Sequence, residues 1–142
     1  MKKILLMLLS LALVFSAVGC DNGEEPAGGT DSKVTGSIVY FFGEEDSAIK
    51  TFNSENTQPK QIELSRGVTY TIGLRPSFKG SKSAFYQGDC ASFSFGDGCC
   101  DIAYIGDVDN KPTYTLVVKS SSNFDLTVKV NSYIQTVKII AV

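Results

Sequence analysis

Apolar side chains recur at every second position in three long stretches of the chain: residues 68–74, 114–118 and 124–130. This alternation is typical of antiparallel strands with one face on a core and the other in water. Shorter apolar segments predict further strands at 34–42, 61–64, 91–95, 101–105 and 136–141. Polar or glycine-rich segments predict turns at 43–47, 65–67, 76–83, 96–98, 107–112 and 120–123. No long segment has a helical period, so residues 34–142 are predicted to form one all-β domain, an antiparallel β-sandwich of about eight strands.

Two segments of this domain resemble bacterial immunoglobulin-like domains. Residues 61–76, QIELSRGVTYTIGLRP, are similar to the opening of such domains, where a short strand, a glycine turn and a tyrosine-bearing strand follow in that order. Residues 114–142, which end in TVKIIAV, are similar to their closing strands. The resemblance implies an immunoglobulin-like topology, and it implies no particular activity because this fold carries many functions.

The first nineteen residues have the layout of a secretory signal peptide. Lys2 and Lys3 form a positive start, and residues 4–18 contain no charged side chain. Small residues, Ala17 and Gly19, end the segment. The apolar run is shorter than the roughly 20 residues that span a bilayer. We therefore expect residues 1–19 to be a signal that exports the chain.

The end of this segment, Ala17-Val18-Gly19-Cys20, resembles the lipobox of bacterial lipoproteins. The resemblance implies that Cys20 receives a diacylglyceryl group, that the chain is cut before it, and that fatty acids such as palmitate hold it in the membrane. Several acyl chains give a firm anchor, since each buried CH₂ contributes about 0.8 kcal/mol. The expected location is the bacterial envelope, with the domain outside the cytoplasm. Ordinary cleavage without lipid is the alternative.

An acidic segment, residues 20–33, separates the anchor from the domain and contains glycine and proline, as flexible tethers do. Without Lys2 and Lys3 the remaining chain has 11 basic and 15 acidic side chains, a net charge of −4. Four of those acids lie in the tether, so the domain itself is close to neutral. Such a charge does not favour nucleic acid as a partner.

Three cysteines remain in the domain: Cys90, Cys99 and Cys100. Export places them where disulfides persist, and their odd number allows one internal bridge. Neighbouring cysteines rarely pair because their Cα atoms are only about 3.8 Å apart. We therefore expect Cys90 to pair with Cys100 or Cys99 and to close a stapled loop. A tight hairpin at 96–98 is the competing structure, since it would separate these sulfurs.

The chain contains no histidine, which removes the catalytic triads and metal sites that depend on imidazole. No nucleophile elbow, phosphate-binding loop or dinucleotide motif is present, so we expect no enzyme and no cofactor. Asp107 and Asp109 would share one face of an extended segment, as the paired carboxylates of a glycosidase do. Together with Asn110 they are also candidate calcium ligands. The third interpretation is a solvated turn.

Four aromatic residues surround the cysteines: Phe85, Tyr86, Phe93 and Phe95. They either belong to the core or form a recognition loop that stacks on sugars or fills a partner's pocket. Tyr86 is the member that we least expect to be fully buried. A glycan or a protein is the expected ligand if these residues bind one.

The sequence favours a non-catalytic binding or adhesion module carried on a lipid anchor. Its contacts are expected from Tyr86 and the loop between Cys90 and Cys100. A structural or accessory subunit of an envelope assembly, which pairs through an exposed strand edge, is the second hypothesis. A small hydrolase working through Asp107 and Asp109 is the third.

Overall fold

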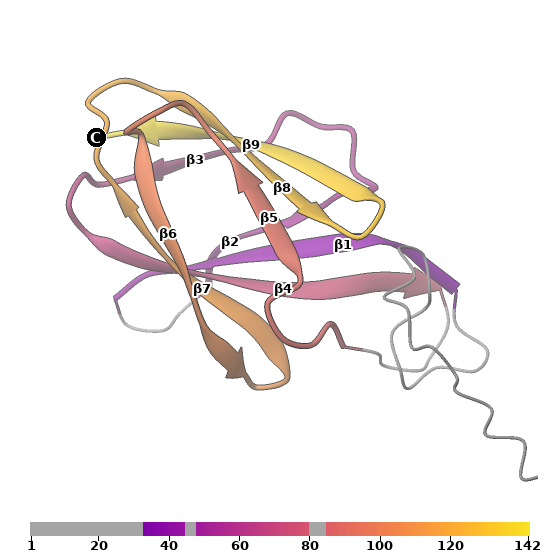
Figure 1. The fold of residues 1–142 in the computed structure, drawn as a ribbon. Coiled ribbons are helices and arrows are strands. Elements are labelled where there is room, and N and C mark those ends of the chain that lie inside the picture. Colours follow the sequence, from indigo (N-terminus) through magenta and orange to yellow (C-terminus); the bar gives the residue numbers. More distant parts are fainter. Residues whose placement is uncertain (1–32, 45–47, 80–84) are drawn as a thin grey trace, which may run out of the picture.

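The computed structural model describes residues 33–44, 48–79 and 85–142, and all regular structure in these ranges is β-strand. The strands form two sheets that pack against each other as a β-sandwich (Figure 1). The signal segment, Cys20 and the acidic segment up to residue 32 lie outside the described residues. Within the described ranges there is no apolar helix of the length that would cross a bilayer.

The first sheet has five antiparallel strands, and the second has four. In the first, the order is β2 (Ala48–Asn53), β1 (Lys33–Phe42), β4 (Thr69–Lys79), β7 (Lys111–Val118) and β6 (Cys100–Val108). In the second, the order is β3 (Gln61–Leu64), β9 (Tyr133–Ala141), β8 (Phe124–Val130) and β5 (Ala91–Ser94). The short β3 runs parallel to β9, while the other neighbours in this sheet are antiparallel.

The core lies between the two sheets and is built from the inward half of each alternating strand. Both sheets contribute side chains that have no contact with water, because successive residues of a strand point to opposite faces. Phe41 packs edge-to-face on Phe52, with ring centroids 5.8 Å apart, and ties the edge strand β2 to this core. The largest fully buried side chains are Phe41, Leu64, Ile72, Leu74, Leu116, Leu126 and Ile139.

The prediction of an all-β domain is confirmed, with nine strands in place of about eight. The strand missed by the sequence is β2, which was not predicted at all. Its burial pattern explains the miss, since Phe52 is its one buried side chain and four of the others are exposed. An edge strand with a single apolar anchor has no recognisable period of two.

Two predicted turns are wrong because strands continue through them. Residues 76–79 belong to β4, where Pro76 pairs with Ser37 of β1. Proline is tolerated there because β4 pairs with β7 only as far as Gly73, so the rest of β4 has one neighbour and its other side is a free edge. Residues 107–112 contain only a two-residue turn, Asp109 and Asn110, which joins β6 to β7.

Candidate functional site

Tyr86 is buried, contrary to the expectation that it would be the most exposed aromatic residue near the cysteines. Its side chain is 4% exposed, and its hydroxyl donates a hydrogen bond to the Gly36 carbonyl at 3.3 Å. Burial raises the pKa of this hydroxyl well above its ordinary value. Tyr86 therefore ties the segment before β5 to strand β1 and is not available to a ligand. Phe85 beside it is half-buried.

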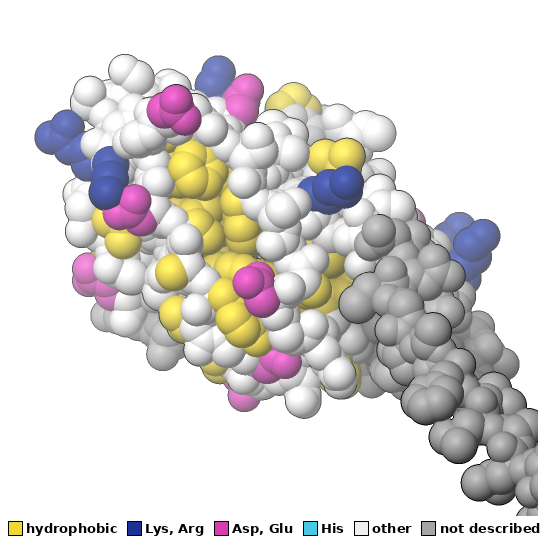
Figure 2. Space-filling model, in the orientation of Figure 1, with side chains coloured by type: hydrophobic (Ala, Val, Ile, Leu, Met, Phe, Trp, Pro, Cys, Tyr) yellow, Lys and Arg dark blue, Asp and Glu magenta, His cyan; other side chains and the backbone are white. Residues whose placement is uncertain are grey.

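Phe93 and Phe95 follow the core interpretation more closely than the recognition interpretation. Both are half-buried and pack against the core, and the Phe93 ring meets Tyr114 edge-to-face at a centroid distance of 4.8 Å. They lie at the side of the sandwich that is bounded by two edge strands, β5 of one sheet and β6 of the other. No further strand among the described residues covers the core on this side. Figure 2 shows hydrophobic side chains gathered on this side. The two phenylalanines thus close the core at its open side.

The predicted disulfide is absent, since Cys90, Cys99 and Cys100 are free thiols. Cys90 directly precedes β5, whereas Cys100 begins β6 in the other sheet. The length of β5 separates them by roughly 13 Å, twice the usual Cα span of a disulfide. A tight turn does exist, with the Cys99 amide bonded to the Gly96 carbonyl at 3.1 Å. It leads from β5 in one sheet to β6 in the other, so the competing hairpin does not form either.

Asp107, Asp109 and Asn110 do not form the extended carboxylate pair that a glycosidase would need. Asp109 and Asn110 have positive φ angles of 49° and 58° and close the tight β6–β7 turn. The Asp107 carboxylate accepts hydrogen bonds from the Gly88 amide at 3.1 Å and the Tyr104 hydroxyl at 2.9 Å. It therefore holds the segment before β5 against β6. No group of three His, Cys, Asp or Glu side chains that could hold a metal occurs in the described ranges, and the calcium interpretation, which also uses Asn110, stays a prediction.

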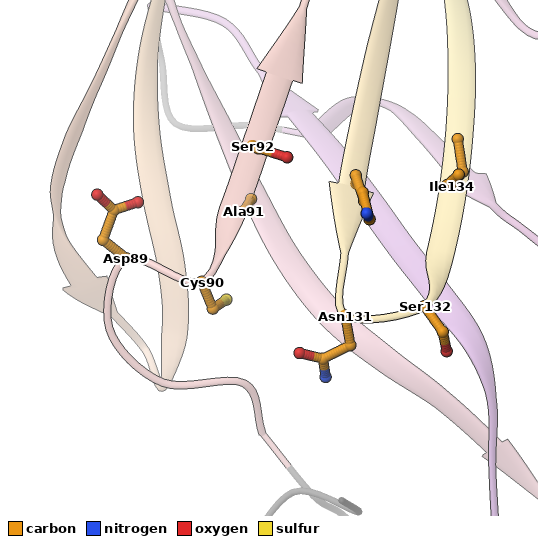
Figure 3. Close-up of a pocket in the computed structure, with 8 residues that line it drawn as sticks. Asp89, Cys90, Ala91, Ser92, Asn131, Ser132 and Ile134 are labelled. Carbon is orange, nitrogen blue, oxygen red and sulfur yellow. The ribbon is translucent and has the colours of Figure 1, made fainter. Parts of the chain in front are cut away.

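A first pocket lies beside Cys90, between the start of β5 and the turn that joins β8 to β9 (Figure 3). Its volume is about 540 Å³, and Asn131 and Ser132 form its opposite side. Desolvation by burial, with smaller contributions from the Asp107 and Asp89 carboxylates, raises the pKa of the Cys90 thiol to about 11. This thiol is protonated near neutral pH, which makes it a poor nucleophile and a poor metal ligand. The pocket is open and largely polar, and Asp89 and Lys129 also line it.

A second pocket lies on the outer face of the five-stranded sheet, and we call it the outer trough. Its volume is about 320 Å³. Four adjacent strands, β1, β4, β7 and β6, contribute its lining, together with the turn between β6 and β7. The lining residues are Phe42, Thr71, Gly73, Ile105, Val108, Asp109, Lys111 and Thr113.

Gly73 keeps the floor of the outer trough open. A Cβ atom at this position would lie 3.2 Å from Cε2 of Phe42 and 3.8 Å from Cδ of Lys111. The Phe42 ring therefore leans over the bare backbone of β4 from one side, and the Lys111 stem approaches from the other. Tyr40 stacks on Phe42 at a centroid distance of 6.1 Å, and the Arg75 guanidinium lies 5.4 Å from the Tyr40 ring centroid.

A β-bulge in β6 shapes the opposite wall. The pairing between β6 and β7 shifts between Tyr104 and Gly106, and Gly106 has a φ of 120° that favours glycine. Ile105 is the extra residue, and a bulge re-aims the side chains around it. Ile105 and Val108 remain 53% and 51% exposed, so an aliphatic wall faces the aromatic wall across the outer trough.

The sequence did not point to the outer trough, because its residues are spread from 42 to 113 and meet only through strand order. One signal was present. Tyr40, Phe41 and Phe42 are consecutive aromatic residues, so at least one of them has to leave the core face of a strand. Phe41 is fully buried, and the other two point outward.

Comparisons with known proteins find no matching family, no matching curated protein and no matching solved structure.

Proposed function

We propose that this chain is a lipid-anchored bacterial envelope protein that presents a non-catalytic β-sandwich binding module outside the cytoplasm. The signal segment, Cys20 and the acidic tether support the anchor. The outer trough supports the binding role and replaces the loop between Cys90 and Cys100 as the proposed ligand surface.

We also propose an immunoglobulin-like topology for the sandwich. The order β1-β4-β7-β6 corresponds to A-B-E-D, and β9-β8-β5 corresponds to G-F-C. The short β3 pairs in parallel with β9, which adds a strand to the second sheet before the chain returns to the first.

The observation that carries the proposed function is the apolar lining of the outer trough. An antiparallel sheet in a sandwich normally turns polar side chains outward. Here Phe42, Ile105 and Val108 face outward around one concavity, although burying them in the core would stabilise the domain. Exposed apolar side chains gathered around a hollow mark an interaction site more often than scattered ones do.

Three features support a non-catalytic role. The chain has no histidine. The Cys90 thiol has a raised pKa and is protonated near neutral pH. The Asp107 carboxylate accepts hydrogen bonds from the Gly88 amide and the Tyr104 hydroxyl, which is a structural role between the segment before β5 and β6.

Assembly through a strand edge is less well supported than ligand binding at the outer trough. Among the described strands, the edges β3 and β5 are only four residues long, and β6 is interrupted by the bulge at Ile105. The edge strand β2 has six residues, and the free side of β4 carries Pro76. Asp101 and Asp107 add exposed charges to β6. Short length, bulges and charge are the means by which proteins protect sheet edges from pairing.

Mass spectrometry of the mature protein, made as the full chain in bacteria, tests the anchor. We expect the chain to begin at Cys20 and to carry a diacylglyceryl group, with a further acyl chain on its amino group. Cys20→Ala should leave the protein unprocessed and release it from the lipid-modified fraction. A mature chain that begins at another, unmodified residue would contradict the proposal.

Photo-crosslinking in cells tests the binding surface. A benzophenone amino acid replaces Val108 at the outer trough, or Thr136, which is exposed on β9 of the other sheet, as the matched control. We expect an adduct at position 108 that Phe42→Ala abolishes, and none of the same size at position 136. If position 108 gives no adduct beyond the control, the outer trough is not the ligand surface.

A further inference from the structure

We propose that the outer trough binds an uncharged saccharide, with the Phe42 ring against the sugar's C–H face and Asp109 and Lys111 at its hydroxyls. This inference rests on the proposed function, which requires only that some ligand occupies the outer trough. The chemical class of the ligand follows from three properties of the lining: its charge balance, its donors and acceptors, and its ordered aromatic wall.

The charge balance of the lining is zero. Asp109 is its one acid and Lys111 its one base. The salt bridge between described residues joins Lys119 to Asp101, so Asp109 and Lys111 do not neutralise each other directly. A strongly acidic ligand would meet the Asp109 carboxylate, and a strongly basic one would meet the Lys111 ammonium. The arrangement therefore favours a ligand without net charge.

The polar groups of the lining also need partners. A carboxylate only accepts hydrogen bonds and an ammonium only donates them, whereas a hydroxyl such as that of Thr71 does both. An apolar side chain of a partner protein would desolvate Asp109 and Lys111 and leave them without partners, which costs free energy. Sugar hydroxyls donate to Asp109 and accept from Lys111, so a saccharide satisfies both groups when water leaves.

The aromatic wall is ordered before any ligand arrives. Phe42 is held by its stacking on Tyr40 and by its close approach to Gly73. A side chain that is already fixed loses little conformational entropy on binding. Its apolar face suits the C–H groups of a sugar ring, as aromatic rings bury apolar surface efficiently. The volume of about 320 Å³ is at the lower end for ligand pockets, so one or two sugar rings would be held.

Isothermal titration calorimetry on the mature full chain in mild detergent tests this inference. The probes are the neutral hexasaccharides of maltose, cellulose, laminarin, xylan and mannan type, with oligogalacturonate as the acidic comparison. We expect at least one neutral probe to bind, and oligogalacturonate to bind more weakly. Phe42→Ala and Asp109→Gly, which removes the carboxylate and suits the φ of 49° at this turn, should each weaken that binding about tenfold or more.

Further variants separate a lost contact from a lost fold. Phe42→Tyr keeps the ring and should keep the binding, while Gly73→Val fills the floor and should abolish it. Thr136→Ala removes an exposed side chain from strand β9 of the other sheet and should change nothing. Each variant is compared with the parent by circular dichroism, so that only folded proteins are scored; if Phe42→Ala does not fold, the contrast between Gly73→Val and Phe42→Tyr decides.

The outcomes distinguish this inference from the proposed function. Binding of neutral probes that depends on Phe42 and Gly73 supports both. Binding of oligogalacturonate alone, or a protein adduct at position 108 without saccharide binding, overturns the saccharide and leaves the binding module standing. Neutral probes that bind equally well to Gly73→Val overturn the assignment to the outer trough. Absence of both saccharide binding and an adduct overturns both.

Discussion

Gln135 is a buried amide without a hydrogen-bond partner, and replacing it should stabilise the protein. The residue lies on β9, opposite Val128 of β8, and its side chain is 2% exposed. Among the described residues, neither its Nε2 nor its Oε1 atom has a hydrogen-bond partner. Burying a polar group in this state costs about 1–3 kcal/mol. Gln135→Met keeps the approximate size and unbranched shape of the side chain and removes that cost.

We expect the free energy of unfolding of Gln135→Met to rise by about 1–3 kcal/mol. For a domain of about 110 residues this corresponds to an increase in Tm of roughly 4 to 13 °C. Urea unfolding followed by circular dichroism and tyrosine fluorescence measures it, because the chain has six tyrosines and no tryptophan. The midpoint should move to higher urea at an unchanged m-value, which reports a change in stability alone.

Gln61→Met is the matched control, since Gln61 is exposed on strand β3 and undergoes the same chemical change. Its effect should stay within about 0.5 kcal/mol, as for most surface substitutions. Gln135→Leu repeats the test with a branched side chain. If both variants at position 135 lose stability by more than the control, the amide has partners in solution, such as a buried water, and the reasoning is refuted.

Three further predictions concern the sites described above. Tyr114→Phe removes a hydroxyl that accepts a hydrogen bond from the Ala91 amide at 3.1 Å and donates one to Asp89 at 3.0 Å. This variant should lower the free energy of unfolding by about 1–3 kcal/mol. An unchanged urea midpoint would contradict these hydrogen bonds. Asn110→Val should destabilise the folded protein by about 1–2 kcal/mol, because a β-branched residue fits poorly at a φ of 58°. Asn110→Gly should be tolerated at the same position. Equal urea midpoints for the two variants would refute the turn geometry. The pKa of the Cys90 thiol rises from 9.0 to about 11 on folding, so the folded state holds its proton longer and stability should fall as the pH rises from 9 to 11. Cys90→Ala should make this decline shallower in urea unfolding series, and an identical pH dependence would argue against a buried thiol.

The aromatic residues near the cysteines, and the cysteines themselves, show which properties of the candidate site can be predicted from neighbouring residues in the sequence. The core interpretation of Phe93 and Phe95 was available from alternation and agrees with their packing. The exposure of Tyr86 was misjudged, because its partner, the Gly36 carbonyl, lies fifty residues earlier in the chain. The disulfide was misjudged because a spacing of ten residues said nothing about the change of sheet between Cys90 and Cys100.

The sequence by itself determined that the described domain is built of strands and which face of each long alternating strand meets the core. That information is local, since alternation along a strand places every second residue on the same face. Strands β3 and β8 were predicted to the residue on this basis. Phe41 and Phe42 illustrate its limit: neighbouring phenylalanines cannot both face the core, but the alternation does not say what the outward ring will meet.

Only the tertiary structure decided which side chains from distant parts of the chain come into contact. The order β1-β4-β7-β6 brings Phe42 to the same concavity as Val108, and the bulge in β6 turns Ile105 toward it. Strand order and register depend on pairings between residues far apart in the chain, and these are set by the closure of the whole core. The outer trough is therefore a property of the folded sheet and of no single segment.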